Sequence, residues 1–312
     1  MCHLANLRTP AKLHPMIDKL DMFIALAREE HFGKAAESLG ITQPTLSSGI
    51  KQLESQLGVQ LVWRGSRFSG LTPEGQRVLE WARRIVGDAR TLKEEMRAVK
   101  DGLSGRVRLA VIPTALTAIT ALTERFGALH PNVTFTILSR SSADILRMLE
   151  NLEAEAGITY LDNEPLGNVV TVPLYREAYC LVCSADSPLA KKQTVEWAEL
   201  ADVPLCLLTP DMQNRRIIDQ NFREAGVSVT SAIESNSTVV LTAHVGTGGR
   251  ATILPTRMAE FLVADKSLCA VPLSEPSTHH AVGLVAPHRE PHTPVLAAFL
   301  KEAAAISEIV AQ

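Results

Sequence analysis

The sequence is poor in aromatic residues, has little excess of either charge and contains no long apolar run. Aromatic residues make up 4% of its 312 residues, and the formal net charge at pH 7 is −3. No apolar span is long enough to cross a membrane, and residues 1–15 lack the apolar core of a signal peptide. We therefore expect a cytoplasmic protein with no membrane partner, in which residues 1–15 are a disordered extension.

Cysteine is also scarce, and its five copies suit a reducing compartment. Cys180 and Cys183 form a C-x-x-C pattern, which can indicate redox or metal chemistry. They lie in EAYCLVCS, however, which reads as a buried strand, and residues three apart on a strand point to opposite faces. We therefore expect inert buried thiols, no metal site and no cofactor.

The common catalytic patterns are missing as well. The sequence has no glycine-rich phosphate loop and no serine in a nucleophile-elbow pattern. Its histidines at 279, 280, 288 and 292 do not have the spacing of metal ligands with carboxylates nearby. We therefore expect that the protein is not an enzyme.

Residues 34–58 carry the clearest pattern that is present, two helices joined by a tight turn. Gly40 stands where the first helix ends, because glycine adopts the left-handed conformation at little cost. Thr42 is a suitable N-cap for the second helix, and Pro44 falls in its first turn, where a missing N–H is harmless. Apolar residues then recur at helical spacing and predict one buried face. They are Leu46, Ile50, Leu53 and Leu57.

The opposite face of this second helix is polar, with side chains that can reach base edges and phosphates. The pattern predicts a helix-turn-helix that binds double-stranded DNA. The alternative is a pair of helices in an ordinary bundle with a solvated polar face. We assign base readout to Gln43, Pro44 and Ser47, with Thr45, Ser48 and Lys51 nearby.

Residues 59–75 predict a strand, a turn and a second strand, the wing of a winged helix. Arg64 and Arg67 lie at its tip, and we assign them, with Lys34, to the DNA backbone; the alternative is a solvated basic turn. Residues 1–103 contain 15 Lys and Arg against 12 Asp and Glu, a small positive excess. The DNA-binding hypothesis for residues 16–72 therefore depends on the motif and not on bulk charge.

Residues 73–103 predict one long linker helix. Apolar residues recur there at alternating steps of four and three, the heptad pattern of a coiled coil that pairs with a second chain. They are Val78, Ala82, Ile85, Ala89, Leu92, Met96, Val99 and Leu103. A dimer through this helix would suit an inverted-repeat DNA site, and the alternative is a helix packed on its own domain.

From residue 104 onward, apolar strand-like runs alternate with helices, which predicts a parallel α/β sheet. Several strands end in hydroxyl or amide residues just before a helix, where open N–H groups favour a small anion such as a carboxylate. The alternative for each residue is a simple N-cap. The candidates are Thr114, Ser141, Ser142, Thr209, Asn236, Ser237 and Thr238.

Nearly the whole chain from residue 16 resembles the LysR-type transcriptional regulators. Residues 20–64 carry their DNA-binding pattern, including the pairs Ala35-Ala36 and Gln43-Pro44. Where the family usually has an arginine after the recognition-helix serine, this chain has Ser48-Gly49 after Ser47. The second half matches at residues 105–109, 186–190 and 253–255.

The resemblance implies a multidomain fold: an N-terminal winged helix-turn-helix, a coiled-coil linker helix, and a C-terminal two-lobed α/β effector-binding domain similar to periplasmic binding proteins. Lobe I would comprise about 104–174 and 275–312, and lobe II about 175–274. It also implies a dimer of dimers, a small-molecule effector and RNA polymerase as a candidate partner. A solute-binding transport protein is the alternative for the second half, but it would need an export signal and would leave residues 16–103 unexplained.

Overall fold

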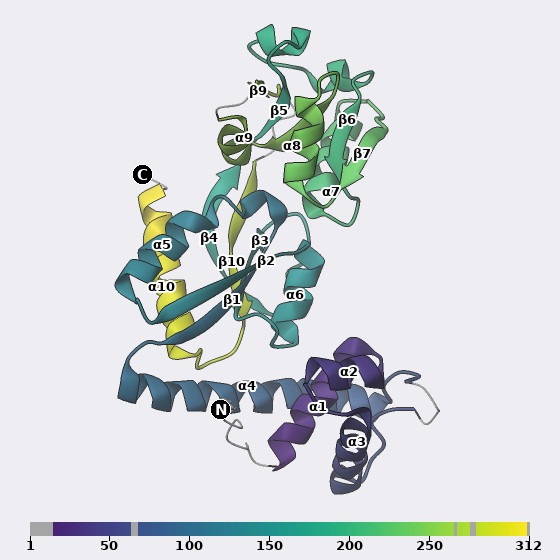
Figure 1. The fold of residues 1–312 in the computed structure, drawn as a ribbon, viewed down its shortest axis with the longest axis vertical. Coiled ribbons are helices and arrows are strands. Elements are labelled where there is room, and N and C mark those ends of the chain that lie inside the picture. Colours follow the sequence, from purple (N-terminus) through teal and green to yellow (C-terminus); the bar gives the residue numbers. More distant parts are fainter. Residues whose placement is uncertain (1–14, 64–67, 265–266, 275–278, 311–312) are drawn as a thin grey trace, which may run out of the picture. The chain divides into compact units, whose positions relative to one another are not determined.

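The computed structural model describes residues 15–63, 68–264, 267–274 and 279–310. The chain divides into two compact units, residues 1–96 and 97–312. None of the helices in these described ranges is long and apolar enough to cross a membrane. A helical first unit, a long helix and a two-sheet α/β unit follow one another along the chain, which confirms the predicted fold class (Figure 1).

The first unit is built from helices α1 (Pro15–Glu29), α2 (Phe32–Ser38), α3 (Gln43–Leu57) and the start of α4 (Pro73–Asp101). Their apolar faces meet in one core, in which Phe23, Leu46 and Leu53 are completely buried. Val62 and Leu71 form a single antiparallel bridge between α3 and α4. We predicted a short strand, a turn and a second strand here, and within the described residues the pairing of the two sides is this single bridge.

Helix α4 carries two apolar stripes. Leu79, Ala82 and Val86 form an inner stripe that is buried in the first unit. An outer stripe of large apolar side chains remains exposed to solvent, with Val99 83% exposed and Leu92 60% exposed. The outer stripe is Trp81, Ile85, Leu92, Met96 and Val99. Packing on its own domain thus accounts for the inner stripe alone.

Lobe I of the second unit is a five-stranded sheet in the order β2-β1-β3-β10-β4. Helices α5 and α10 pack together through Phe126 and Phe299, whose rings meet edge to face, while α6 packs against β3. The strands are β1 (Gly105–Val111), β2 (Val133–Ser139), β3 (Ala156–Tyr160), β4 (Val169–Glu177) and β10 (His280–Pro287). The helices are the short 3₁₀ helix η1 (Pro113–Ala115), α5 (Ile119–Leu129), α6 (Ser142–Glu150) and α10 (Pro294–Val310).

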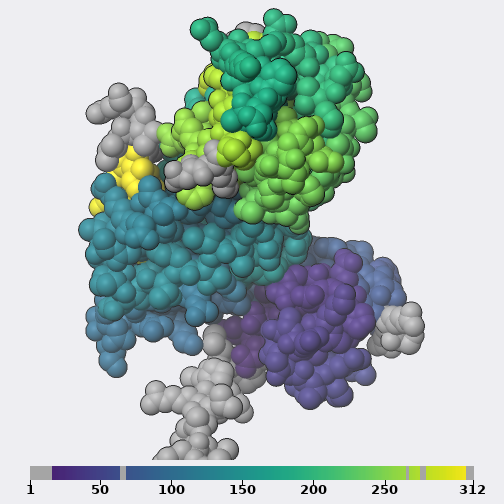
Figure 2. Space-filling view, turned by 45° about the horizontal axis from the view of Figure 1, so that its top comes forward, coloured from purple at the N-terminus to yellow at the C-terminus, as the bar shows by residue number. Residues whose placement is uncertain are grey.

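Lobe II is a second five-stranded sheet, in the order β7-β6-β8-β5-β9. Its strands are β5 (Tyr179–Ser184), β6 (Leu205–Leu208), β7 (Ser231–Ser235), β8 (Ala251–Pro255) and β9 (Leu268–Pro272). Its helices are η2 (Pro188–Lys191), η3 (Trp197–Leu200), α7 (Gln213–Glu224), α8 (Thr238–Gly246) and α9 (Thr256–Val263). In Figure 2 the green surface of lobe II rests on the teal surface of lobe I.

Both sheets are mixed, so the prediction of a parallel sheet is wrong in part. β1 runs parallel to β2 and β3, and β6 runs parallel to β7 and β8. β10 is antiparallel to both of its neighbours, and so is β5. These two strands are the ones that the chain enters from the other lobe, because β4 is followed by β5 and β9 by β10. After each crossing, the first strand in the new lobe therefore runs opposite to its two neighbours in the sheet.

Candidate DNA-binding surface and effector cavity

The turn between α2 and α3 has the predicted local chemistry. Gly40 has a φ of +66°, in the left-handed region. Thr42 caps α3 by accepting a hydrogen bond at Oγ1 from the N–H of Thr45, at 3.4 Å. Gly58 ends α3 with a φ of +71°. The start of α3 is therefore set by residues that the sequence alone identifies.

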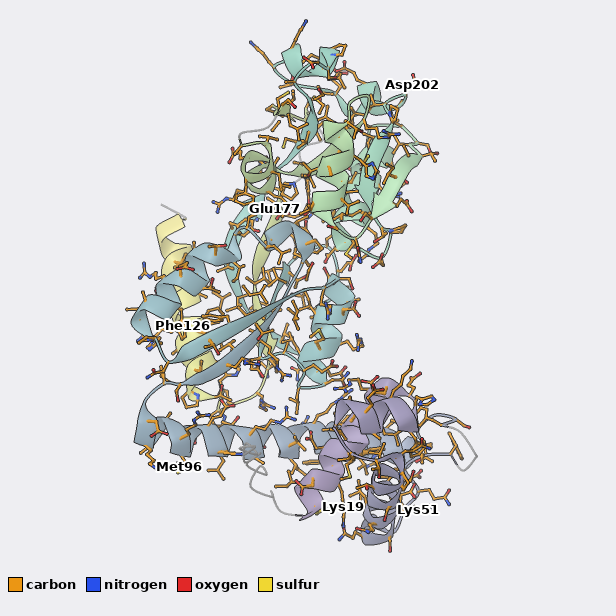
Figure 3. All side chains as sticks on the ribbon, in the orientation of Figure 1. Lys19, Lys51, Met96, Phe126, Glu177 and Asp202 are labelled. Carbon is orange, nitrogen blue, oxygen red and sulfur yellow. The ribbon has the colours of Figure 1, made fainter. Side chains whose placement is uncertain are left out.

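The polar face of α3 points outward, because Leu46, Ile50 and Leu53 are at most 1% exposed on the other side. Most of the predicted DNA-contacting side chains that the structure describes are exposed, and Ser47 is half-buried. The exposed ones are Lys34, Gln43, Pro44, Thr45, Ser48 and Lys51. Figure 3 shows Lys51 on α3. Arg64 and Arg67 lie outside the described residues.

Gly49, which we noted as a departure from the family pattern, has a packing role. It is buried on the inner side of α3, and a Cβ there would lie 2.5 Å from Sδ of Met22 on α1. Glycine leaves room here for the side chain of Met22. The position directly after Ser47, where the family usually has arginine, is Ser48, and Ser48 is exposed on the polar face of α3.

Glu54 links α3 to the wing. Its Oε1 accepts hydrogen bonds from the backbone N–H groups of Leu61, at 2.8 Å, and Val62, at 3.3 Å. Trp63 N–H donates to the carbonyl of Gly70 at 3.1 Å and holds the two sides of the wing together. The base of the wing is thus fixed to the C-terminal half of the helix that bears the exposed polar face.

The second unit contains a small cavity between its two lobes, with a volume of about 10 Å³, roughly the space of one water molecule. Lobe I contributes the end of β1, the start of α6 and Tyr160, and lobe II contributes the end of β6 and the start of α7. The lining residues are Ile112, Pro113, Thr114, Ser142, Tyr160, Leu208, Met212, Gln213 and Asn214. Two polar atoms of this lining, Thr114 Oγ1 and Asn214 Oδ1, are buried without a hydrogen-bond partner among the described residues. Such atoms need a polar partner, which a water molecule or a ligand group in the cavity can supply.

Among the predicted effector-binding residues, Thr114 and Ser142 line this cavity. Ser142 Oγ accepts a hydrogen bond from Thr159, and Ser141 caps α6 by accepting from the N–H of Asp144 at 3.2 Å. Thr209 Oγ1 is buried without a partner in the described chain, one residue beyond the lining residue Leu208.

The turn that precedes α8 does not belong to the lining of the cavity. Ser237 N–H donates to Ser235 Oγ at 3.2 Å, and the carbonyl of Thr238 accepts from Thr242. Asn236 is exposed. These three residues, Asn236, Ser237 and Thr238, were predicted because of their place at a strand end.

Behind the cavity lies a buried cluster that sequence reasoning missed. Its centre is Glu177, which is 3% exposed, and the three tyrosines of the chain surround it. Tyr160 donates a hydrogen bond to Glu177 Oε2 at 2.7 Å, and Tyr175 donates to Oε1 at 3.3 Å. Tyr179 Oη lies 3.2 Å from Tyr160 Oη. Figure 3 marks Glu177 at the junction of the two lobes.

This cluster connects directly to the cavity. Asn214 Nδ2 donates to Tyr160 Oη at 3.3 Å, so Tyr160 can accept from Asn214 while it donates to Glu177. Burial raises the pKa of Glu177 to about 7, because its bonds to Tyr160 and Tyr175 only partly offset the loss of water. The signal that could have revealed the site is a carboxyl within the apolar run VVTVPLYREAYCLVCS.

No charged side chain is part of the cavity lining. Arg215 is engaged with Asp219 and Glu234, and Arg216 forms a two-pronged ion pair with Glu164 of lobe I, at 2.7 and 2.8 Å. Helix α7 begins at the cavity, and no described side chain caps its first N–H groups. The polar groups that the start of α7 offers to the cavity are therefore its open backbone N–H groups, which favour an anion.

A helix-turn-helix with an exposed polar face, joined to a two-lobed binding domain, is the architecture of a DNA-binding regulator. The model "Bacterial regulatory helix-turn-helix protein, lysR family" matches residues 17–76, and "LysR substrate binding domain" matches residues 100–306. The chain belongs to the LysR family of transcriptional regulators. This confirms the predicted family and the prediction that the protein is not an enzyme, and it excludes a transport protein.

Individual proteins show the same similarity. The uncharacterized HTH-type transcriptional regulator YbhD of Escherichia coli K12 is 30% identical over 270 residues, 86% of this chain and 84% of its own. A full-length variant of OxyR from Pseudomonas aeruginosa has a TM-score of 0.69 at 24% identity, covering 94% of this chain and all of that one. The effector binding domain of QuiR in complex with shikimate has a TM-score of 0.58 at 20% identity, covering 66% and 99%. The two solved structures share the fold.

The buried carboxyl of Glu177 predicts a dependence of stability on pH. Its pKa rises from the ordinary 4.5 to about 7, so between these values the folded chain keeps a proton that the unfolded chain has released. The contribution of this group is fully present below pH 4.5 and is lost toward pH 7, by about 1.4 kcal/mol per pH unit at the steepest point.

Urea unfolding of the full chain, followed by the fluorescence of buried Trp197, measures this loss between about pH 5 and about pH 7. Glu177→Gln should remove the slope that this carboxyl contributes. Glu124→Gln on the exposed side of α5 is the control and should keep it. If Glu177→Gln and the wild-type chain lose stability in parallel, the carboxyl does not hold its proton in the folded state.

Proposed function

We propose that this regulator binds an inverted-repeat operator and responds to a small, anionic metabolite held between the lobes of its second unit. The observation that carries the proposal is the outward polar face of α3, opposite the buried Leu46, Ile50 and Leu53. A regulator of this kind works in the cytoplasm, and RNA polymerase is its candidate partner at the promoter.

In this proposal the first turns of α3 enter the major groove. Gln43, Pro44 and Ser47 read the bases, and Thr45, Ser48 and Lys51 lie beside them. Lys34, Arg64 and Arg67 contact the phosphate backbone. The exposure of Gln43 and Lys51 supports this arrangement, as does the bond from Glu54 that fixes the wing to α3.

Replacing Gln43 with Ala tests base readout. The amide can bond a base edge with two hydrogen bonds, so its loss should cost about 1–3 kcal/mol on the cognate site and little on random DNA. Gln56→Ala, near the C-terminal end of α3 and bonded to Lys19, is the control that should bind both DNAs normally. Fluorescence anisotropy at fixed salt measures both. An equal loss on the two DNAs for Gln43→Ala would show that this residue does not read bases.

The outer stripe of α4 supports a dimer, and the proposal adds a dimer of dimers through the second units. Exposed apolar residues at heptad spacing are stable in water when a second helix covers them. Two copies joined at α4 would present two α3 helices to the half-sites of an inverted repeat.

A charge in this stripe should separate the chains. Leu92→Asp would bury a carboxylate in the helix pair and should weaken association by several kcal/mol. Arg97→Asp lies on the side of α4 turned away from the stripe and is the matched control. Sedimentation at low concentration gives the mass of each variant. A Leu92→Asp protein with the oligomeric mass of the wild type would place the interface elsewhere.

The orphaned polar atoms of the cavity support the effector site. An anion there would accept from the open N–H groups of α7 and from the hydroxyl of Thr114. Thr209, Ser141 and the 236–238 turn remain proposed contributors. The same fold holds shikimate in QuiR, which favours a small organic ligand. Such a ligand would favour one arrangement of the lobes and so change how the assembly holds its DNA-binding units.

Thr114→Val keeps the shape of the side chain and removes the hydroxyl. The ligand for the test is a small carboxylate that raises the melting temperature of the wild-type protein. Thr114→Val should weaken the binding of this carboxylate by about 1–3 kcal/mol, because the anion loses a buried donor. Isothermal titration measures the loss, and DNA binding without ligand should be unchanged. If Thr114→Val binds the ligand as the wild type does, the cavity is not the effector site, and the same result for Thr238→Val would remove the 236–238 turn as a contributor.

A further inference from the structure

Two cysteines of lobe II face each other across neighbouring strands. Cys183 on β5 is the direct partner of Cys269 on β9 in an antiparallel ladder, and their Sγ atoms lie 3.9 Å apart. Directly opposite residues in such a ladder have Cα atoms about 4.5–5.5 Å apart, within the range that a disulfide spans. Bond formation needs the sulfurs to approach by about 2 Å.

The two thiols differ in their access to solvent. Cys183 is 1% exposed, and burial together with the neighbouring Cys269 raises the pKa of its thiol. Cys269 is half-buried on β9, the edge strand of the sheet, which pairs with β5 alone. A small oxidant therefore reaches Cys269 first, and Cys183 lies behind it as a protected second thiol.

The pair is distinct from the C-x-x-C pattern of the sequence. Cys180 points to the other face of β5 and donates to the carbonyl of Leu254 at 3.6 Å, as the strand geometry predicts. Cys183 instead packs in the main apolar cluster. The partner of Cys183 is thus supplied by a strand 86 residues further along the chain.

We propose that Cys183 and Cys269 are a redox couple, in which a hydroperoxide converts the two thiols into an intramolecular disulfide. The thiolate of Cys269 attacks a peroxide oxygen, an S–O bond forms, and the O–O bond breaks to release water or an alcohol. Cys183 then attacks the sulfenic sulfur, so that an S–S bond forms and the S–O bond breaks. The departing hydroxide takes the thiol proton of Cys183 and leaves as water. Two electrons pass from the thiols to the peroxide in total, and thiol exchange reverses the reaction.

The disulfide would restrict the movement of β9, the last strand of lobe II. β9 is held by its ladder to β5, and it is the last strand before the chain returns to β10 of lobe I. A covalent bond from β9 to β5 would prevent this edge from opening. Oxidation would thus act at the second crossing between the lobes, and the inference does not depend on the identity of the effector.

Hydrogen peroxide is the probe that tests the couple in the full chain. Brief treatment, followed by alkylation of free thiols and peptide mass spectrometry, should give a cross-linked peptide containing Cys183 and Cys269. The product should lack two hydrogens and revert with dithiothreitol. Cys206→Ser on β6 is the control, since Cys206 is buried away from this pair, and it should give the same cross-link.

Single variants test the order of the steps. Cys183→Ser should accumulate Cys269 sulfenic acid, which dimedone traps, while Cys269→Ser should leave Cys183 reduced. The result with the wild-type protein decides the proposal. The proposal is wrong if peroxide leaves both thiols reduced, or if Cys269 is overoxidised or joined to another cysteine while Cys183 remains free.

Discussion

The second unit depends on a crossing between two sheets that is one residue long. β4 ends lobe I at Glu177 and β5 begins lobe II at Tyr179, with Ala178 between them. The carbonyl of Ala178 accepts from Thr256 N–H at 2.9 Å, which ties the crossing to the start of α9. Because no loop separates the sheets, a carboxyl at the end of β4 is enclosed by both lobes. Tyrosine hydroxyls are then its nearest donors, and Tyr160 passes that contact on to Asn214 at the cavity.

The first unit depends on a different constraint, the burial of one side of α3. Leu46, Ile50 and Leu53 fill the core, and Gly49 admits Met22 between them, so the remaining side faces solvent. The turn at Gly40 and the cap at Thr42 fix where this helix begins. The polar residues near its start, from Gln43 to Ser48, are thereby presented together, as base readout in a major groove requires.

Local chemistry made much of this predictable from sequence. Helix caps, a glycine turn and helical periodicity are short-range signals, and they gave α3 and the exposure of Gln43 correctly. The cavity was predicted in part: Thr114 and Ser142 were found because they follow strands, whereas Tyr160 and Asn214 were missed. Their role arises from contacts between residues 54 positions apart, which no local pattern encodes. The prediction of a parallel sheet was wrong in part for a similar reason. The antiparallel directions of β5 and β10 follow from the two crossings between the lobes, which are a property of the whole topology.

Sequence-specific DNA binding through α3 is the claim on which the functional account depends most. The direct test is to sequence the double-stranded fragments that the full-length protein retains from a random pool, in parallel with the Gln43→Ala variant. The account predicts that the wild-type protein enriches an inverted repeat, and that the variant retains DNA without that enrichment. Retention of fragments with no common sequence by the wild-type protein, or the same enriched sequence with both proteins, would contradict it.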